Sequence, residues 1–523
     1  MTLAASQPKP PFAALAVAGY GAVLGSLFPV MTVMTVADIS GGLSVASDSG
    51  ALVNTLQNIG AVAGLLAAPS IAAGIGRGRT MAVTGTGFVF ASIACAIAPS
   101  LGWMLIARFF HGVFGGVLPL MFMLLVMTSL RPGHGQFEGM SLFAASTTLF
   151  FGLAASAGGW LVDHWGWRAL FWAQAAAAAP YCVAAATVLR SEKGHPGVLR
   201  SADWPSYVLL SAGLGMILFA LSEGERHFWL GAWWVPALLA GGAILTGFAA
   251  HNLIRGERPL LMFAVFRRPT FSWAICLSIF FRFGSLFAIF IVPAYLGRIQ
   301  GLRPAEIGQL LAVMSPATAL ALLAAWAMAQ RFDSRWLLSA GLACFAFASW
   351  LCVGLGSDWA AEQLQCAAIV AGFGMGLFAV AVLRFAVFGA TMQDGPTVGV
   401  VFNLTRVFGI VCGLAIVTHL VAEREKFHSA ILTESLTATD PETAQRLAVT
   451  AGAFGRFAAD ASGAQRAAQA TLARAASGQA FTMAFADAFT ITAIALALGA
   501  VLVWALPGIP AEAASSSPSG SPA

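Results

Sequence analysis

Long uninterrupted runs of apolar residues dominate the chain, and short polar segments separate them. A membrane-spanning helix needs roughly 20 consecutive apolar residues, whereas the strands of a membrane barrel alternate apolar and polar positions over about ten. The runs here are continuous and of helix length, so they predict helices that satisfy their backbone hydrogen bonds internally. About fourteen such spans are expected, at residues 12–37, 52–74, 80–99, 103–129, 138–161, 168–189, 205–222, 231–251, 271–296, 306–329, 336–355, 361–388, 397–421 and 481–506.

The basic residues of the short connecting segments predict the orientation of these spans. Cytoplasmic loops carry an excess of Lys and Arg, and an even number of spans puts both termini on one side. With the N-terminus inside, the cytoplasmic segments hold Lys9, Arg77, Arg79, Arg131, Arg190, Lys193, Arg200, Arg255, Arg258, Arg267, Arg268, Arg331 and Arg335. The opposite short loops hold only Arg168, Arg226, Arg298 and Arg303. Both termini are therefore predicted to be cytoplasmic.

Three polar segments lie outside the predicted spans. Residues 1–11 are a short cytoplasmic N-terminus, and the apolar run after them is too long for a cleaved signal peptide, so we interpret it as a retained span. Residues 422–480 are polar and alanine-rich and are predicted to be extracytoplasmic, with an amphipathic helix over Ala464–Gln479. Residues 507–523 are rich in Ala, Ser, Pro and Gly and are predicted to form a disordered cytoplasmic tail.

The composition agrees with a chain that is mostly embedded in lipid. Of its 523 residues 59% are hydrophobic and 9% charged, whereas soluble domains carry about 25% charged residues. The net charge of +5 is attributed to cytoplasmic loops, because no basic stripe with interleaved aromatics indicates nucleic-acid binding. The seven cysteines lie in apolar runs without a Cys-x-x-Cys pair, which argues against a metal site. Without a GxxxxGK(S/T) loop or a catalytic cluster, neither ATP-powered transport nor an enzyme is predicted, and no cofactor is expected.

Charged residues inside apolar runs are costly in lipid and mark candidate pathway residues. Arg108 and His111 lie three residues apart in the fourth run, on neighbouring helix positions. His111 titrates near neutral pH and is a candidate proton carrier; the alternative is a hydrogen bond between helices. Arg282 lies in the middle of the ninth run with no mid-span acid to pair with it. This favours a water-filled pathway or an anionic substrate group over a buried ion pair, with snorkelling of the side chain or a structural bond to carbonyls as the alternative.

Uncharged polar side chains extend the set of candidates. Asn54, Gln57 and Asn58 lie on one face of the second predicted helix, and such a stripe faces either a cavity or another helix. Asn403 and Arg406 lie one helical turn apart in the thirteenth run. They are polar enough to line a cavity, with a structural contact as the equal alternative.

The C-terminal part carries motifs that identify a family. Asn403-Leu404-Thr405-Arg406 is followed by Gly409 and Gly413, by Arg424 and His428, by Leu432-Thr433-Glu434-Ser435, and, at the start of the last span, by Asp487 and Phe489. With this order of motifs, the chain resembles the major facilitator superfamily. Within it, the chain is similar to the fourteen-span drug:proton antiporters of the EmrB/QacA type.

Three general motifs of this superfamily occur in altered form. The loop that resembles the family's cytoplasmic gate motif reads Gly74-Ile75-Gly76-Arg77-Gly78-Arg79 and lacks the usual acid. The fourth-span motif reads Arg108-Phe109-Phe110-His111-Gly112, with histidine for glutamine. The fifth-span antiporter-like motif keeps Gly158 and Gly159 but has Ala154-Ala155 for Gly-Pro. The family's first-span acid falls at Phe28, which leaves His111, Asp38 and Asp487 as candidate proton carriers.

The resemblance implies an all-α polytopic membrane protein with the major facilitator fold. Two six-helix bundles, residues 12–189 and 271–506, would be joined by a linker region, 190–270, with two additional transmembrane helices. The implied function is secondary active export of hydrophobic or amphipathic small molecules from a bacterial inner (plasma) membrane, driven by protons through alternating access. A periplasmic membrane-fusion protein and an outer-membrane channel are expected partners, beside the substrate and the bilayer. Export of one metabolite, such as a siderophore or fatty acid, and a sensor without transport remain alternatives.

Overall fold

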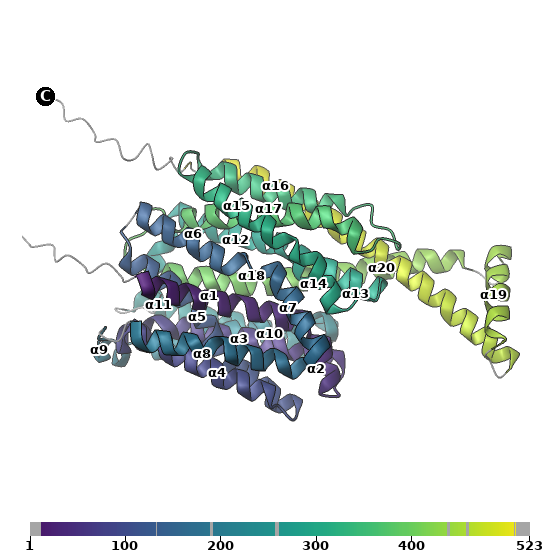
Figure 1. The fold of residues 1–523 in the computed structure, drawn as a ribbon, viewed down its shortest axis with the longest axis horizontal. Helices are drawn as coiled ribbons and strands as arrows, with labels where there is room; N and C mark the ends of the chain where they lie inside the picture. Colours follow the sequence, from purple (N-terminus) through teal and green to yellow (C-terminus); the bar gives the residue numbers. More distant parts are fainter. Residues whose placement is uncertain are drawn as a thin grey trace, which may run out of the picture.

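The computed structural model describes residues 12–131, 133–188, 192–256, 261–436, 440–456, 460–506 and 508. Within these ranges the regular structure is entirely helical, which confirms the all-α prediction. In Figure 1 the long helices run side by side, with α9 (Pro196–Arg200) at one end and α2 (Val36–Gly42) and α19 (Pro441–Phe454) at the other. We call these the α9 end and the α2 end. The predicted tails, 1–11 and 507–523 apart from Gly508, and the basic residues Arg190 and Arg258 lie outside the described ranges.

The remaining helices follow in chain order. The first half holds α1 (Phe12–Met34), α3 (Ser47–Ile75), α4 (Arg77–Ala96), α5 (Leu101–Ser129), α6 (His134–Thr148), α7 (Phe151–Trp165) and α8 (Trp167–Val188). The linker region holds α10 (Trp204–Glu223), η1 (Glu225–His227), η2 (Trp229–Gly231), α11 (Trp234–Arg255) and η3 (Phe263–Arg267). The second half holds α12 (Pro269–Leu286), η4 (Phe287–Ile291), α13 (Val292–Ile299), α14 (Pro304–Ala312), α15 (Met314–Ala329), α16 (Ser334–Leu351), α17 (Ala361–Val387), α18 (Gly395–Ser435), α20 (Ala461–Leu502) and η5 (Val503–Ala505).

Thirteen segments of the described chain are long and apolar enough to cross a bilayer, so this is a multi-pass membrane protein. They correspond to thirteen of the fourteen predicted runs. The other run, 336–355, is α16, an 18-residue helix that holds Arg335 in its first turn and packs against α17 and α20. All fourteen predicted spans are therefore helical, although α16 lies at the short and polar limit for a span.

Three spans are interrupted in ways that the apolar pattern does not reveal. The fifth breaks between α6 and α7, and the tenth breaks between α14 and α15. In the ninth, η4 is a π-helical turn between α12 and α13. Such turns inside an α-helix are rare and occur often at functional sites; here Ile289 of η4 borders the central cavity described below.

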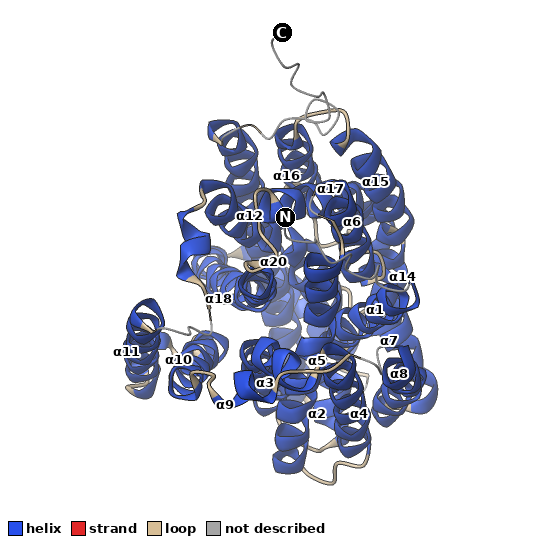
Figure 2. Cartoon of the chain, turned by 90° about the vertical axis from the view of Figure 1, so that its left-hand side faces the viewer, coloured by secondary structure: helices blue, strands red, loops and turns tan. Residues whose placement is uncertain are grey.

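The helices form two packed groups with the linker helices at their edge. In the first group α3 packs on α5, α4 on α8 and α1 on α5; in the second, α16 and α15 pack on α17, and α18 on α20. The groups meet through α7 with α14, α6 with α17, and α5 with α18. Figure 2 shows α10 and α11 outside this assembly, where α10 touches both α3 and α18. The extra helices are thus central in the chain but peripheral in space.

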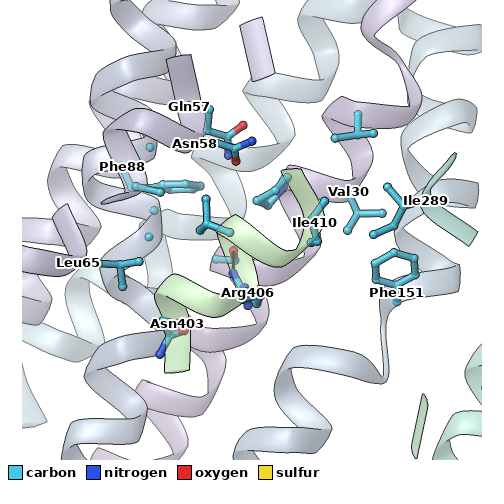
Figure 3. A pocket seen from close by; sticks show the side chains of 18 of the residues that line it. Val30, Gln57, Asn58, Leu65, Phe88, Phe151, Ile289, Asn403, Arg406 and Ile410 are labelled. Carbon is cyan, nitrogen blue, oxygen red and sulfur yellow. Dashed lines mark hydrogen bonds between the residues drawn. The ribbon is translucent and has the colours of Figure 1, made fainter. Parts of the chain in front are cut away.

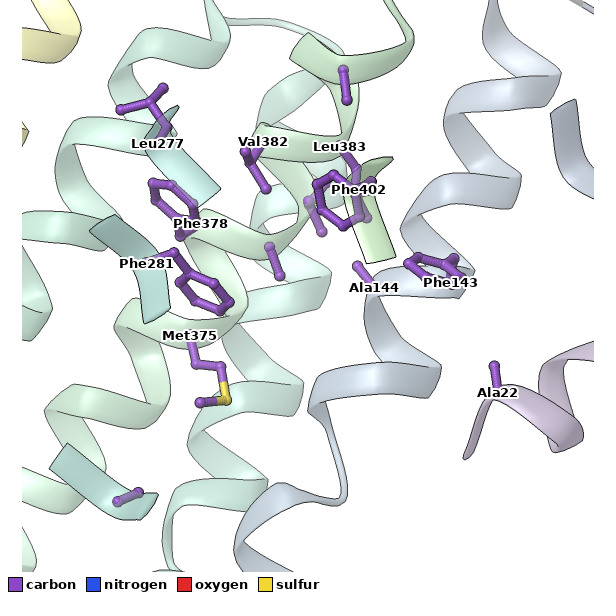
Figure 4. Close-up of a cluster of buried hydrophobic side chains, with 14 of the residues drawn as sticks. Ala22, Phe143, Ala144, Leu277, Phe281, Met375, Phe378, Val382, Leu383 and Phe402 are labelled. Carbon is purple, nitrogen blue, oxygen red and sulfur yellow. The ribbon is translucent and has the colours of Figure 1, made fainter. Parts of the chain in front are cut away.

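Close packing of apolar side chains fills the second half and its contact with α6 of the first half. Figure 4 shows Phe281 of α12 beside Phe378 of α17, whose rings are stacked with centroids 4.9 Å apart. Phe143 and Ala144 of α6 contribute to the same buried cluster from the first half. Because lipid tails are as apolar as these side chains, the association depends on van der Waals fit rather than on exclusion of water.

The predicted polar segment 422–480 is largely helical and projects beyond the bundles. α18 and α20 have 41 and 42 residues, so each is about 60 Å long, roughly twice the hydrocarbon thickness of a bilayer. Their far ends and α19 form a helical arm at the α2 end (Figure 1). The stretch Ala464–Gln479 is the part of α20 in this arm, continuous with the last span.

Candidate functional site

A cavity of about 120 Å³ lies between the two halves, bounded by α1, α3 and α5 on one side and by η4 and α18 on the other. Figure 3 shows Leu65 and Phe88 across the cavity from Val30, Phe151 and Ile289. Most of the wall is apolar, which is a lining typical of ligand-binding pockets. The polar part of the wall is formed by Gln57, Asn58, Asn403 and Arg406.

Four of the eight predicted pathway residues therefore line this cavity, and the other four lie behind its wall. Of the latter, Arg108 is fully buried next to α3. Its guanidinium donates to the side-chain oxygen of Gln57 and to Asn54 Oδ1 at 3.4 Å, and it lies over the Phe171 ring, 5.6 Å from the centroid. Neutral acceptors and an aromatic face thus stabilise a buried positive charge.

His111 is fully buried one helical turn from Arg108 and is held from two sides. Its Nε2 lies 2.9 Å from Gln174 Oε1 on α8, and its Nδ1 lies 3.5 Å from Arg108 Nη1. A neutral ring with the proton on Nε2 satisfies both contacts, because Nε2 then donates and Nδ1 accepts. The ring also packs on Phe88, with centroids 4.3 Å apart, and Phe88 forms part of the cavity wall. His111 is therefore separated from the cavity by a single aromatic side chain.

Glycines bring these groups together by letting the backbones of α3 and α5 touch. At Gly60, Gly64 and Gly112 an added Cβ would collide with the backbone of the opposite helix. At Gly116 it would lie 2.9 Å from the Cβ of Ala61. Gly112 and Gly116 have the four-residue spacing of small residues that permits close helix packing in membranes.

Arg406 connects the two halves across the cavity. Its Nη1 donates to Ser26 Oγ at 2.8 Å, and its Nη2 donates to the Gly25 carbonyl at 3.3 Å, both on α1. Asn403, one turn earlier on α18, donates to the Gly399 carbonyl at 2.9 Å and lies near Met123 of α5. Both residues thus lie at the meeting point of the halves.

Arg282 of α12 lies beside the α18 segment that carries Arg406. An added Cβ at Gly409 would lie 2.7 Å from Arg282 Cγ, which places the arginine against α18 one turn beyond Arg406. The buried Nε of Arg282 has no hydrogen-bond partner in the described chain, and its guanidinium lies over the Phe281 ring at 4.7 Å. The unpaired Nε of Arg282 is thus held beside the α18 segment that carries Arg406.

At the α2 end, the halves close through glycine-mediated contact of α7 with α14. Gly158 packs on Met31 of α1, where an added Cβ would lie 3.1 Å from the Met31 Cβ. At Gly159 an added Cβ would lie 2.5 Å from Ala305 Cα, so the backbones of α7 and α14 touch. Gly308 of α14 approaches the α7 backbone in the same way.

Asp38 belongs to an ion-pair cluster over this contact and does not border the cavity. Arg303 of the second half lies 2.5 Å from Asp163 Oδ1 and 3.6 Å from Asp38 Oδ1, both in the first half. Burial raises the pKa of the Asp38 carboxyl; the Arg303 charge opposes this effect and the Asp163 charge adds to it. The cluster links the two halves where they must separate for the cavity to open toward this end.

At the α9 end, the motif Gly74 to Arg79 forms the tight connection between α3 and α4. Gly76 has φ of +95°, a conformation that favours glycine. Arg77 Nε pairs with Glu192 at 2.6 Å, and its Nη1 donates to Ser129 Oγ at 2.9 Å and to Thr128 Oγ1. Gly78 and the exposed Arg79 follow in the first turn of α4. The acid missing from the motif is thus supplied by the segment after α8.

Asp487 lies at the base of the helical arm, away from the cavity. Its carboxylate accepts from Arg424 Nε at 2.6 Å and lies 2.7 Å from His428 Nε2, both on α18. The structure therefore brings none of the candidate carboxylates to the central cavity, and only His111 lies close behind its wall. Within the described ranges no group of His, Cys, Asp and Glu forms a metal site, and the seven cysteines are free thiols.

Asp163, Glu192 and Gly308 are among the residues of these contacts that were not singled out by the sequence. Glu192 pairs with a residue 115 positions away, and Asp163 pairs with a residue from the other half. Gly308 is one of 56 glycines in the chain. The one available signal was the acid missing from the Gly74–Arg79 motif, which invites a search for a carboxylate elsewhere.

The comparisons to known proteins agree with the fold. A model of the Major Facilitator Superfamily matches residues 12–274. The chain belongs to the Major Facilitator Superfamily. This confirms the family predicted from the motifs, and the chain is a transporter of that superfamily.

Curated relatives of this superfamily transporter are similar at low identity. The uncharacterized MFS-type transporter YhcA of Bacillus subtilis is 22% identical over 68% of this chain and 66% of its own length. The colistin resistance protein EmrB of Acinetobacter baumannii is 24% identical over 67% of this chain and 68% of its own length. The methylenomycin A resistance protein of Streptomyces coelicolor is 26% identical, over 67% and 73%. The chain thus matches about two thirds of the length of the first two relatives.

Solved structures support the superfamily fold over nearly the whole chain. The proton:xylose symporter XylE superposes with a TM-score of 0.57 at 13% identity, covering 95% of this chain and 96% of XylE. A bacterial homolog of the human lysosomal transporter Spinster superposes with a TM-score of 0.52 at 14% identity, covering 96% and 97%. At these identities the likeness concerns the fold of the transporter alone.

Proposed function

We propose that this transporter exports hydrophobic or amphipathic small molecules from a bacterial inner membrane, with both termini cytoplasmic. The observation that carries the proposal is the cavity at the interface of the halves, whose apolar wall holds only four polar residues. An apolar wall with a few polar groups suits a molecule that has an apolar body and a polar end. Two of the relatives are named as resistance proteins, for colistin and for methylenomycin A, which is consistent with export.

Alternating access is the mechanism that we propose for this export. The halves touch through α7 and α14 at the α2 end and through α5, α6, α17 and α18 toward the α9 end. Opening one set of contacts while the other stays closed would expose the cavity to one side at a time. The Arg303 cluster joins the halves at the α2 end and would be broken when that end opens, whereas the partners of Arg77 do not belong to the second half.

Proton coupling is proposed to use His111. In the described chain no carboxylate borders the cavity, and His111 lies behind Phe88 in contact with Arg108 and Gln174. Protonation would place a second positive charge beside Arg108, which disfavours the charged ring in this conformation. A conformation that separates the two residues or admits water would favour it, so proton uptake would follow the opening of the cavity.

Proton release from reconstituted vesicles tests this proposal. We expect addition of a fluorescent amphipathic dye to release protons in proteoliposomes that contain the native chain. The variant His111→Gln keeps a side chain that can bond to Gln174 but cannot carry the proton, so it is expected to lose dye-dependent proton release. His251→Gln, at an exposed position on α11, is the matched control. Unchanged proton release in His111→Gln would eliminate His111 as the carrier.

Dye accumulation in cells tests the direction of transport. Expression of the chain is expected to lower the accumulation of the dye, and equal accumulation with and without expression would count against export. We further propose that the helical arm contacts a periplasmic membrane-fusion protein that feeds an outer-membrane channel. Crosslinking from the arm that recovers no such partner would remove this part of the proposal.

A further inference from the structure

Positive charge is concentrated around the central cavity. Arg406 forms part of its wall, Arg282 lies one turn away along the α12–α18 contact, and Arg108 is hydrogen-bonded to the wall residue Gln57. Arg282 packs on Gly409, one turn beyond Arg406 on α18, and two positive charges placed this close in the membrane interior repel each other. Arginine stays protonated in proteins, so this repulsion is not relieved by the loss of a proton.

Carboxylates do not balance this charge in the described parts of the chain. Every arginine in a described ion pair lies toward one end of the bundles or on the helical arm, and neither Arg282 nor Arg406 is among them. Near the α2 end Asp38 and Asp163 are already paired with Arg303. The positive region between the halves is thus open to a negative partner from outside the protein.

Both guanidinium groups have donors left for such a partner. A guanidinium has five N–H donors. Arg406 uses one for Ser26 and one for the Gly25 carbonyl, and the buried Nε of Arg282 has no acceptor in the described chain. Unpaired charged donors inside a membrane protein are costly and mark substrate or ion pathways.

We propose that the molecules this transporter carries have an anionic group, such as a carboxylate, phenolate or sulfonate, that Arg406 and Arg282 bind together. The apolar body of the molecule then lies against Phe88, Phe151 and Ile289 on the cavity wall. A planar guanidinium binds oxyanions through two parallel hydrogen bonds, which makes arginine better suited to this task than lysine. The proposal rests on the proposed export function and narrows its substrates from amphipathic molecules to amphipathic anions.

Three probes that share one apolar body test this proposal, whatever the natural substrate is. At neutral pH 1-naphthaleneacetate is an anion, 1-naphthaleneacetamide is uncharged and 1-naphthylmethylammonium is a cation. We expect the full chain in lipid nanodiscs to bind the anion at least about 10-fold more tightly than the other two, as measured by equilibrium dialysis. A hydrogen bond to a charged group stabilises by roughly 1.5–3 kcal/mol, which corresponds to about 10- to 100-fold in affinity.

Charge-removing variants locate the site. Arg406→Gln and Arg282→Gln are each expected to lower the affinity for the anion about 10- to 100-fold and to leave that for the amide unchanged. Arg331→Gln, at an exposed position after α15, removes the same charge elsewhere and is expected to change neither. If a glutamine variant fails to fold, Arg406→Lys and Arg282→Lys, which keep the positive charge, replace it. The relative affinity of the native chain for the three probes still decides whether the site prefers an anion.

The outcomes separate this inference from the proposed function. Equal binding of the acid and the amide by the native chain, or equal losses for all three probes in Arg406→Gln, would overturn the anion site. Export of the amide or the amine but not of the acid from proteoliposomes would overturn it too, while leaving export intact. Selective binding of the acid without export of any probe would support the anion site and count against the exporter.

Discussion

The packing of Gly308 against α7 predicts that one added methyl group opens the transporter at the α2 end. In Gly308→Ala the new Cβ would lie 2.5 Å from Ser156 N and 2.7 Å from Ala155 C. These neighbours are backbone atoms, which cannot rotate away as a side chain does. Restoring an ordinary contact of 3.4 Å requires α7 and α14 to move apart by about 1 Å.

The energetic cost of this collision applies only while α7 and α14 are in contact. An extra methyl group in a well-packed interior costs about 1–3 kcal/mol. A conformation in which the halves are separated at this end does not have that cost, so the equilibrium moves toward it by roughly 5- to 150-fold. The substitution thus acts on the balance of states and leaves the cavity wall unchanged.

Labelling of a single introduced cysteine measures this balance. Met34→Cys lines the cavity on α1 and is placed in a chain whose seven cysteines are replaced by alanine. A membrane-impermeant maleimide is added outside intact cells, the side proposed for the α2 end. Gly308→Ala is expected to raise the labelling rate by roughly 5- to 150-fold.

Gly297→Ala is the matched control, because its added Cβ would have no neighbour closer than 3.9 Å. Gly297 belongs to α13 near the same end, so the two variants differ mainly in the space around the new methyl group. Labelling of Gly308→Ala at the rate of Gly297→Ala would refute the claim that the α7–α14 contact closes this end.

Three further predictions follow from the polar contacts. Arg77→Ala removes a partly buried ion pair and two hydrogen bonds, so it is expected to lower the free energy of unfolding by about 1–2 kcal/mol and with it the melting temperature of the purified protein. Arg79→Ala, at an exposed position, is expected to change the free energy of unfolding by less than about 0.5 kcal/mol. Gln57→Leu removes a hydrogen-bond acceptor from the buried Arg108 and is expected to lower the free energy of unfolding by roughly 1.5–3 kcal/mol. Asn58→Leu is expected to alter substrate binding and to leave the free energy of unfolding nearly unchanged. Burial raises the pKa of Asp38, so the protonated carboxyl stabilises the closed α2 end. This stabilisation is fully present below pH 3.8 and is lost as the pH rises through the raised pKa. Asp38→Asn is expected to remove this pH dependence from the labelling assay.

Each of these predictions has an outcome that contradicts it. Equal melting temperatures for Arg77→Ala and Arg79→Ala would show that the contacts at the α9 end do not stabilise this conformation. Destabilisation by Asn58→Leu as large as that by Gln57→Leu would assign both residues a structural role. Labelling that becomes faster on acidification, or that depends on pH as strongly in Asp38→Asn, would contradict the sign derived for Asp38.

The spans could be predicted from the sequence because a membrane imposes a local rule on each of them. A run such as 361–388 must be apolar and helical wherever it lies, and it is helical as α17. The arm was predicted only in part, as an amphipathic helix over Ala464–Gln479, because the stability of the rest of the arm is not local. Residues 422–480 lack an apolar run, yet most of them are helical, because α18 and α20 continue past the bundles and pack on each other.

In the candidate site, too, single residues within a span could be predicted from the sequence, whereas contacts between helices could not. Gln57, Asn58, Asn403 and Arg406 attract attention in the sequence because polar residues in apolar runs are costly, and all four border the cavity. The pairs of Arg303 with Asp163 and of Arg77 with Glu192 depend on which helices meet, which no local pattern contains. Asp487 is a candidate proton carrier in the sequence, at the start of the last predicted span, but its partners Arg424 and His428 hold it at the base of the arm.

The continuity of α18 has a mechanical consequence. The helix runs without a break from Arg406 at the cavity to Ser435 in the arm, a length of about 44 Å. A tilt of about 10° near Arg406 would therefore sweep the tip of the arm through roughly 8 Å. Because α18 is one continuous helix, a small tilt near a bound molecule produces a large displacement of its end outside the lipid. The position of the tip, measured with a spin label or an antibody, would then report whether a molecule occupies the cavity.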